Sequence, residues 1–182
     1  MAVFTHGEVG HTKSSDEIGV LADNRFHAHR LIPSTMTTSA NIPATSGPWR
    51  LAVRAVVHDA QGRMLLLRRS NVCRNFVGCW EWPGGKVDPG EDFASAVRRE
   101  TREETSLEAE ITGLAGVTHF AAPAAHFVML CMEVKTIGGE FKLSEEHDDY
   151  AWVAPGDFPK LPFTGQVTQF MLEYAKRKGT TP

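Results

Sequence analysis

Three glutamates, Glu100, Glu103 and Glu104, lie within one short segment of the chain. A helix that begins near Asp92 would place their side chains within one turn of one another. Like charges at this spacing repel, so a purely structural helix would gain nothing from them. A divalent cation would turn the repulsion into binding, because Mg²⁺ and Mn²⁺ prefer hard oxygen ligands. The segment therefore indicates a metal site that could neutralise a pyrophosphate and acidify a bound water.

The residues around the glutamates fit the same chemistry. Gly84 and Gly85 have no side chains, so their backbone could approach a metal ion and phosphates closely. Arg99 could pair with Glu91 or Glu103 to orient the carboxylates, or it could contact phosphate itself. The alternative is a solvated surface helix with Arg–Glu pairs, which is the usual meaning of a charged run. The fixed offsets of the glutamates from Gly85 and Glu91 favour the metal site.

The surrounding pattern predicts the elements that would position this segment. A helix is expected over residues 92–105, because Pro89 and Gly90 break the chain before it and its apolar residues form one stripe. Strands are predicted over residues 50–58, 63–69, 80–82, 111–120, 126–135 and 150–153, and a last helix over residues 166–177. This order predicts an α/β fold with helices on both sides of a central mixed sheet.

The composition of the 182-residue chain is that of a globular protein, with 42% hydrophobic and 23% charged residues. A net charge of −3 argues against binding to polymeric nucleic acid or to anionic membranes, and no stretch has the ~20 apolar residues of a membrane span. Three cysteines without a C-x-x-C pair indicate reduced thiols in a cytoplasmic protein. Residues 1–48 show no lasting period, so we expect a flexible tail before a domain over residues 49–182.

The glutamate segment resembles the Nudix box, G-x5-E-x7-R-E-U-x-E-E-x-G-U, in which U is an apolar residue. The matching positions are Gly85, Glu91, Arg99, Glu100, Glu103, Glu104 and Leu107. Two positions depart from the pattern: Thr101 stands at an apolar site, and Ser106 replaces a glycine. Ser106 must then accept a helix-end conformation that glycine adopts more easily.

The resemblance covers about residues 49–178 and implies the Nudix α/β/α sandwich. It also implies Mg²⁺-dependent hydrolysis of a nucleoside diphosphate linked to another group, with Mn²⁺ as a possible substitute. The metal ligands would be the Gly85 carbonyl and the carboxylates of Glu100, Glu103 and Glu104. Arg99 would orient this cluster through Glu91.

The resemblance leaves the general base open. Glu103 or Glu104 could activate the attacking water, but in some relatives an acid outside the box does so. Glu145 and Glu146, in the loop before the last predicted strand, are the outside candidates, and Glu146 is included among the expected catalytic residues. A solvated acidic loop is the alternative interpretation.

The approach WEWPGGKVDPGE resembles the MutT-like branch, whose members remove oxidised or non-standard nucleoside triphosphates. In that branch the positions of Arg69 and Trp82 belong to the nucleotide pocket. An indole stacks well on a purine, and an arginine suits a phosphate or a base edge. We therefore expect Trp80 in the core and Trp82 against the base. Gln166 is the amide nearest to the position where oxidised-guanine relatives carry an asparagine.

These observations predict a pyrophosphohydrolase that acts on a nucleoside triphosphate or a related small nucleotide. A dinucleoside polyphosphate, nucleotide-sugar or ADP-ribose hydrolase is the alternative, and it would need a second pocket for which the sequence shows no marker. A catalytically silent nucleotide-binding module generally loses box glutamates, and this chain keeps them all. A diphosphate isomerase would call for a catalytic cysteine, for which Cys79 is a weak candidate.

Overall fold

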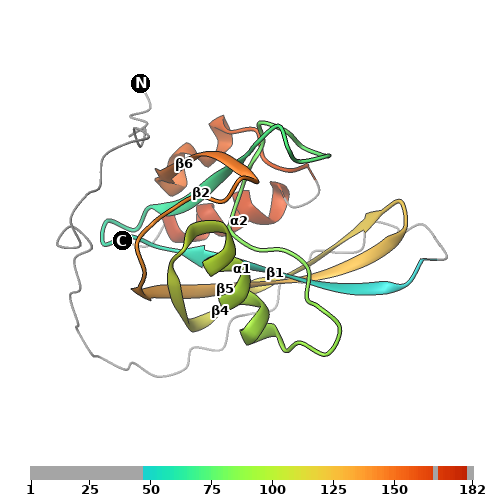
Figure 1. Ribbon diagram of the computed structural model, residues 1–182. Coiled ribbons are helices and arrows are strands. Elements are labelled where there is room, and N and C mark those ends of the chain that lie inside the picture. The colour runs from blue at the N-terminus through green and yellow to red at the C-terminus, as the bar shows by residue number, and fades with distance from the viewer. Residues whose placement is uncertain (1–46, 166–167, 180–182) are drawn as a thin grey trace.

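The computed structural model describes residues 47–165 and 168–179, so nearly all of the expected tail over residues 1–48 lies outside the described residues. The predicted order of strands and helices is confirmed, and the later strands are longer than expected (Figure 1). The elements are β1 (Trp49–Val57), β2 (Met64–Arg69), β3 (Trp80–Glu81), α1 (Phe93–Thr105), β4 (Glu108–Ala122), β5 (Ala125–Gly138), β6 (His147–Val153), the 3-10 helix η2 (Pro155–Lys160) and α2 (Thr168–Gly179).

The strands form two three-stranded sheets that meet at β1. In the first sheet, β5 lies between β1 and β4, parallel to β1 and antiparallel to β4, which gives the predicted mixed sheet. In the second sheet, β2 lies between β3 and β6 and is antiparallel to both. The chain that leaves β3 then runs beside β1, where Val53 N–H donates to the Gly85 carbonyl (2.9 Å) and Ala55 N–H to the Pro83 carbonyl (2.7 Å).

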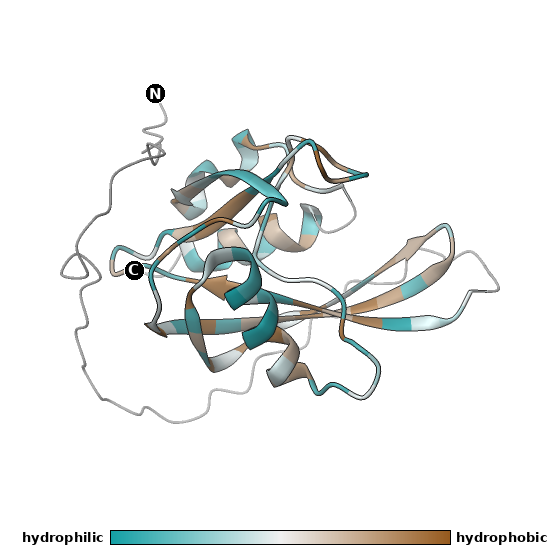
Figure 2. Ribbon diagram, in the orientation of Figure 1, coloured by the Kyte–Doolittle hydropathy of each residue, from teal (hydrophilic) through white to brown (hydrophobic). Residues whose placement is uncertain are grey.

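The core has two apolar clusters on opposite faces of β1, because successive side chains of a strand point to opposite faces. Val53, Ala55 and Val57 belong to the cluster that α1 covers, and Ala52 and Val56 belong to the cluster that α2 covers. The two helices therefore flank the sheet, as predicted. Figure 2 shows hydrophobic residues concentrated in the central strands, whereas α1 carries a hydrophilic stretch.

Local signals fix both ends of α1, the helix that carries the glutamates. Asp92 caps its start by accepting from the backbone N–H groups of the second and third residues that follow, each at 2.9 Å. Ser106 ends it in the left-handed conformation (φ 59°), with its N–H donating to the Arg102 carbonyl at 2.8 Å, which confirms the helix-end prediction. Thr101 is fully buried, and its hydroxyl donates to the Val97 carbonyl at 2.7 Å. No helix in the described part of the chain is long and apolar enough to span a membrane.

Candidate active site in the glutamate helix

Two of the box glutamates lie against the glycine turn that follows β3. The Gly84 N–H donates to Glu104 Oε2 at 2.7 Å. A Cβ placed on Gly85 would lie 2.6 Å from Glu100 Oε1, so a side chain there would displace the carboxylate. Gly84 has a φ of 139°, and a side chain on it would collide with the Val53 carbonyl of β1. The sequence needs both glycines because the turn is pressed between β1 and the glutamates.

Arg99 connects the carboxylates to one another. Its Nε and Nη2 donate to the two oxygens of Glu91 at 2.9 and 2.8 Å. Its Nη1 donates to Glu100 at 2.9 Å and to Glu103 at 3.1 Å, and its Nη2 also donates to the Lys86 carbonyl at 3.0 Å. A planar guanidinium suits such two-pronged contacts better than an ammonium does. These are the contacts expected of an arginine that orients the cluster through Glu91.

Burial makes the ionised state of these glutamates costly. It raises the pKa of Glu104 to about 8, against the opposing effects of the Arg54 charge and the Gly84 N–H. Burial likewise raises the pKa of Glu100, whereas Arg99 opposes this shift. A bound cation would favour the ionised carboxylates instead. The all-oxygen donor set and the close glycine cradle fit a hard divalent cation.

The carboxylates of Glu100, Glu103 and Glu104 do not converge on one point. Over residues 47–165 and 168–179, no three His, Cys, Asp or Glu side chains lie close enough together to hold a metal ion as they stand. Glu103 is 56% exposed at its side chain and bonds to Arg99, whereas Glu104 is buried under Gly84. The helix therefore brings the three expected ligands near one another, with Glu103 on its solvent-exposed side.

A pocket of about 210 Å³ is lined by Arg54, which also donates to the Gly84 carbonyl of the glycine turn. Its polar lining includes Arg54, Arg69 and Glu81, and its apolar lining includes Phe76, Phe120 and Met129. Phe76 has a φ of 57°, a conformation that is strained for an aromatic residue, and its side chain is largely exposed. The pocket thus combines two cationic side chains with two aromatic ones.

Glu81 holds the two arginines of this pocket. It is only 1% exposed, and its carboxylate accepts from Arg69 Nη1 at 2.5 Å and from Arg54 Nη2 at 2.8 Å. His147 Nε2 lies 3.4 Å from the oxygen that Arg69 contacts. Burial alone would raise the pKa of Glu81, but the Arg54 charge and the hydrogen bonds from His147 and Arg69 lower it to about 2.

Trp82 lies in the core, which corrects the expectation that it stacks against a base. It is 1% exposed and packs edge-on against Phe170 and Tyr174, with ring centroids 6.2 and 5.5 Å away. Trp80 belongs to the same cluster, as predicted. Residues two apart on an extended chain face the same side, so the two tryptophans share the core and Glu81 points away from it.

The sequence pattern of the NUDIX domain matches residues 48–173, more than half of the chain. The chain belongs to the Nudix family. An ADP-ribose pyrophosphatase from Methanocaldococcus jannaschii is 32% identical over 62% of this Nudix chain and 66% of its own length, just under two thirds. Nucleoside triphosphatase NudI from Escherichia coli O1:K1 is 31% identical over 53% of this chain and 76% of its own.

The crystal structure of a MutT protein from Methanosarcina mazei Go1 superposes with a TM-score of 0.67 at 29% identity, covering 76% of this chain and all of that one. The Nudix homologues are hydrolases that act on phosphoanhydride bonds of nucleotide substrates, and Nudix hydrolases generally need a divalent metal.

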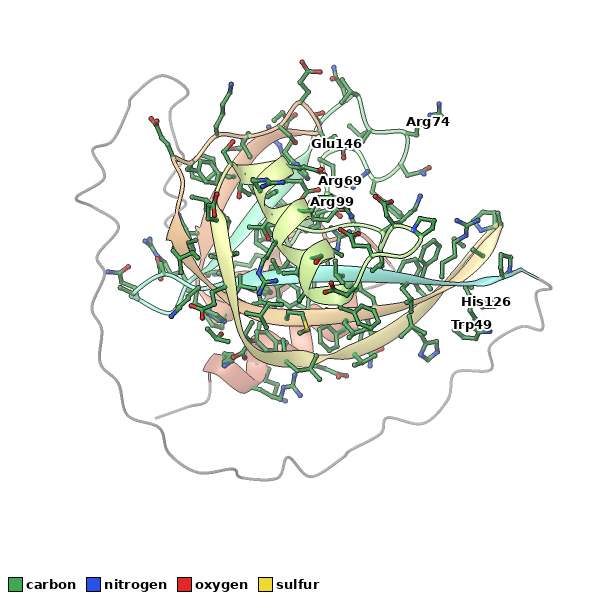
Figure 3. The ribbon with its side chains drawn as sticks, turned by 60° about the horizontal axis from the view of Figure 1, so that its bottom comes forward. Trp49, Arg69, Arg74, Arg99, His126 and Glu146 are labelled. Carbon is green, nitrogen blue, oxygen red and sulfur yellow. The ribbon has the colours of Figure 1, made fainter. Side chains whose placement is uncertain are left out.

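The remaining expected residues of the Nudix site lie at its rim or outside the described residues. The Glu146 side chain is exposed, and its negative charge acts on Arg69. Figure 3 shows Arg69, Arg99 and Glu146 toward the same side of the domain, away from Trp49 and His126. Gln166 lies outside the described residues.

Sequence reasoning missed Arg54, Glu81 and His147. The signal for Arg54 was an arginine in the middle of the apolar part of β1, and the signal for Glu81 was a carboxylate between two core tryptophans.

Proposed function

We propose that this Nudix hydrolase is a Mg²⁺-dependent pyrophosphohydrolase of a nucleoside triphosphate or a related nucleotide. The observation that carries the proposal is the adjacency of the pocket and the glutamates. Arg54 lines the pocket and also donates to the Gly84 carbonyl, while the N–H of the same glycine donates to Glu104. A nucleotide with its base in the pocket would therefore present its phosphates to the glycine turn.

The proposed metal ligands are the Gly85 carbonyl and the carboxylates of Glu100, Glu103 and Glu104. When bound, Mg²⁺ would neutralise the diphosphate and lower the pKa of a coordinated water, and Mn²⁺ could replace it because both prefer oxygen ligands. Arg99 supports this assignment by fixing Glu100 and Glu103 from one guanidinium. The glycine turn supports it by leaving room for the carboxylates.

The proton of the attacking water would be accepted by one of three carboxylates, those of Glu103, Glu104 and Glu146. A general base must be within reach of the water it activates. Glu103 and Glu146 are solvent-exposed, whereas Glu104 is buried and already accepts the Gly84 N–H. The pH dependence of kcat in the three Glu→Gln variants tests the assignment: only the variant that lacks the base should lose the acidic limb of the profile.

The lining of the pocket supports a substrate with a single base. Phe76 and Phe120 suit the faces of a planar base, and Arg69 suits a phosphate or a base edge. The volume of about 210 Å³ lies below the ~300–1,000 Å³ of pockets that enclose drug-sized ligands. A nucleoside triphosphate fits this description, and ADP-ribose, the substrate in the name of the archaeal relative, is the second candidate.

A phosphate-release screen tests the proposal. It would compare (deoxy)nucleoside triphosphates, oxidised nucleotides, dinucleoside polyphosphates, ADP-ribose and nucleotide sugars, each with Mg²⁺ and with EDTA. We expect hydrolysis of a nucleotide that carries one base, and only in the assays that contain Mg²⁺ and not in those that contain EDTA. The Glu104→Gln control should lower kcat by at least about 100-fold while substrate still binds. Turnover of none of these compounds, or undiminished turnover by Glu104→Gln, would contradict the proposal.

A further inference from the structure

We infer that Arg54 is a positioning residue of the metal site, and that the Arg54–Glu81 pair links this site to the substrate pocket. The inference rests on the proposed function, because it concerns the same glutamates. It adds a residue outside the Nudix box that sets the geometry inside it.

The side chain of Arg54 completes the attachment of the glycine turn to β1. Along an extended segment, alternate carbonyls point in opposite directions, so the backbone of a neighbouring strand reaches only every second one. Here the β1 backbone bonds to the carbonyls of Pro83 and Gly85. Arg54 Nη1 donates to the other two carbonyls: that of Trp82, just before Pro83 (2.9 Å), and that of Gly84, between Pro83 and Gly85. Four consecutive carbonyls are therefore held by three consecutive residues of β1.

Fixing this turn fixes the carboxylates beneath it. The Gly84 carbonyl accepts a hydrogen bond from Arg54, and the Gly84 N–H donates one to Glu104, so the arginine and the glutamate both bond to one residue. Gly85, the next residue, lies in close contact with Glu100. The Arg54 charge also acts on both glutamates. A shift of the turn would move two of the proposed ligands and the Gly85 carbonyl together.

Glu81 holds Arg54 in this orientation from the pocket side. Its Oε2 accepts from Arg54, and its Oε1 accepts from Arg69, which lies on the pocket wall. The Arg54 side chain is 16% exposed and that of Glu81 is 1% exposed, so the pair is largely shielded from water. Changing one partner of a buried ion pair destabilises a protein much more than changing one partner of a surface pair, because the other charge is left buried without its partner.

A positioning role and a purely electrostatic role predict different results for metal binding. If Arg54 acted only through its positive charge, Arg54→Lys, which keeps the charge, would leave metal binding unchanged. If Arg54 positions the turn, Arg54→Lys loosens metal binding as Arg54→Met does. Arg54→Met removes the charge, and Arg54→Lys keeps the charge but cannot reach three acceptors with a planar fork.

The test is Mn²⁺ binding to the full chain without nucleotide, measured by electron paramagnetic resonance. We expect both Arg54→Lys and Arg54→Met to weaken Mn²⁺ binding by roughly 10- to 100-fold, the usual range for a residue that orients metal ligands. In Mg²⁺-dependent turnover, Arg54→Lys should lower kcat more than it raises KM. The matched control is Arg63→Lys, because Arg63 forms an ion pair with Asp59 in the turn after β1. The Mn²⁺ affinity and the kcat of this variant should stay within about twofold of wild type.

Glu81→Gln is the second variant, because it preserves shape while weakening the hold on Arg54. Circular dichroism and thermal unfolding establish that each variant is folded, and Glu81→Gln decides the question if Arg54→Lys does not fold. Unchanged or tighter Mn²⁺ binding in a folded variant would overturn the inference. The outcome does not depend on the substrate: a chain that binds Mn²⁺ but hydrolyses no nucleotide would contradict the proposed function and leave this comparison valid.

Discussion

Glu104→Gln should stabilise the metal-free protein, and the gain should grow with pH. Burial raises the pKa of Glu104 to about 8, whereas the ordinary value for an exposed glutamate is 4.5. Between these values the folded state keeps the proton and the unfolded state releases it. Folding then takes up a proton, so the contribution of Glu104 to stability is greatest below pH 4.5 and is lost as the pH rises toward about 8. This is the cost of keeping a proposed metal ligand buried without a metal.

The size of the effect follows from the interval between the two pKa values. A difference of one bound proton changes the free energy of unfolding by about 1.4 kcal/mol per pH unit. From pH 4.5 to about 8, the wild-type protein should therefore lose about 4 kcal/mol that the variant keeps, slightly less than the full slope over this interval because Glu104 is half-ionised in one of the two states at each end. A typical domain has only ~5–15 kcal/mol in total. The glutamine amide oxygen can still accept the Gly84 N–H, so the hydrogen bond is retained.

Urea unfolding in EDTA, at intervals from about pH 5 to about pH 8, measures this difference. The control is Glu110→Gln, whose carboxylate is exposed and has its pKa lowered by a hydrogen bond from Lys135. Glu110 is ionised in both states over this range, so its variant should differ from wild type by a constant amount. Parallel stability curves for wild type and Glu104→Gln would refute the reasoning. Saturating Mg²⁺ should reverse the order, since the cation binds the ionised carboxylate.

Three further predictions concern Arg99, the substrate pocket and the C-terminal end of α1. Arg99→Lys should lower kcat by roughly 10- to 100-fold in steady-state assays, because lysine cannot bond both oxygens of Glu91 while holding the other carboxylates; an unaltered kcat would remove Arg99 from the site. Phe76→Ala should raise KM by about 5- to 100-fold with little change in kcat, the equivalent of ~1–3 kcal/mol of base stacking; an unaltered KM would mean that the base does not meet this ring. Ser106→Gly should raise the free energy of unfolding by about 0.5–1 kcal/mol and increase Tm, because φ is 59° there; a lower Tm would contradict this.

The glutamate helix could be predicted in detail because its determinants are local. The breakers before it and Ser106 after it are read from adjacent positions, and the structure has the helix between them, with Asp92 as its cap and not as its first residue. The contacts of Arg99 also follow from spacing, since Glu103 is four residues away on the same helix and Glu91 lies just before the helix. The pocket is different. Phe120 and Met129 reach it through the pairing of β4 with β5, and no local pattern sets that pairing.

The misplacement of Trp82 came from transferring the pocket position of the MutT-like branch to this chain without following the alternation of the strand. Trp80 and Trp82 share one face, and both lie in the core. Once one tryptophan is assigned to the core, alternation assigns the other to the core as well and turns Glu81 to the opposite side. The residue that points toward the pocket is therefore the carboxylate and not the indole.

That carboxylate could have led to the arginines. A glutamate between two core residues is buried, and a buried charge needs a partner of opposite sign because desolvation otherwise costs several kcal/mol. β1 carries Arg54 between apolar neighbours, whereas its other arginine, Arg50, is exposed near the start of the strand, and β2 ends in Arg69, so the candidates were present in the sequence. The structure pairs both with Glu81. One buried acid thus accounts for Arg54 on β1 and Arg69 on β2, and it joins the pocket and the proposed metal-binding carboxylates through one connected set of hydrogen bonds.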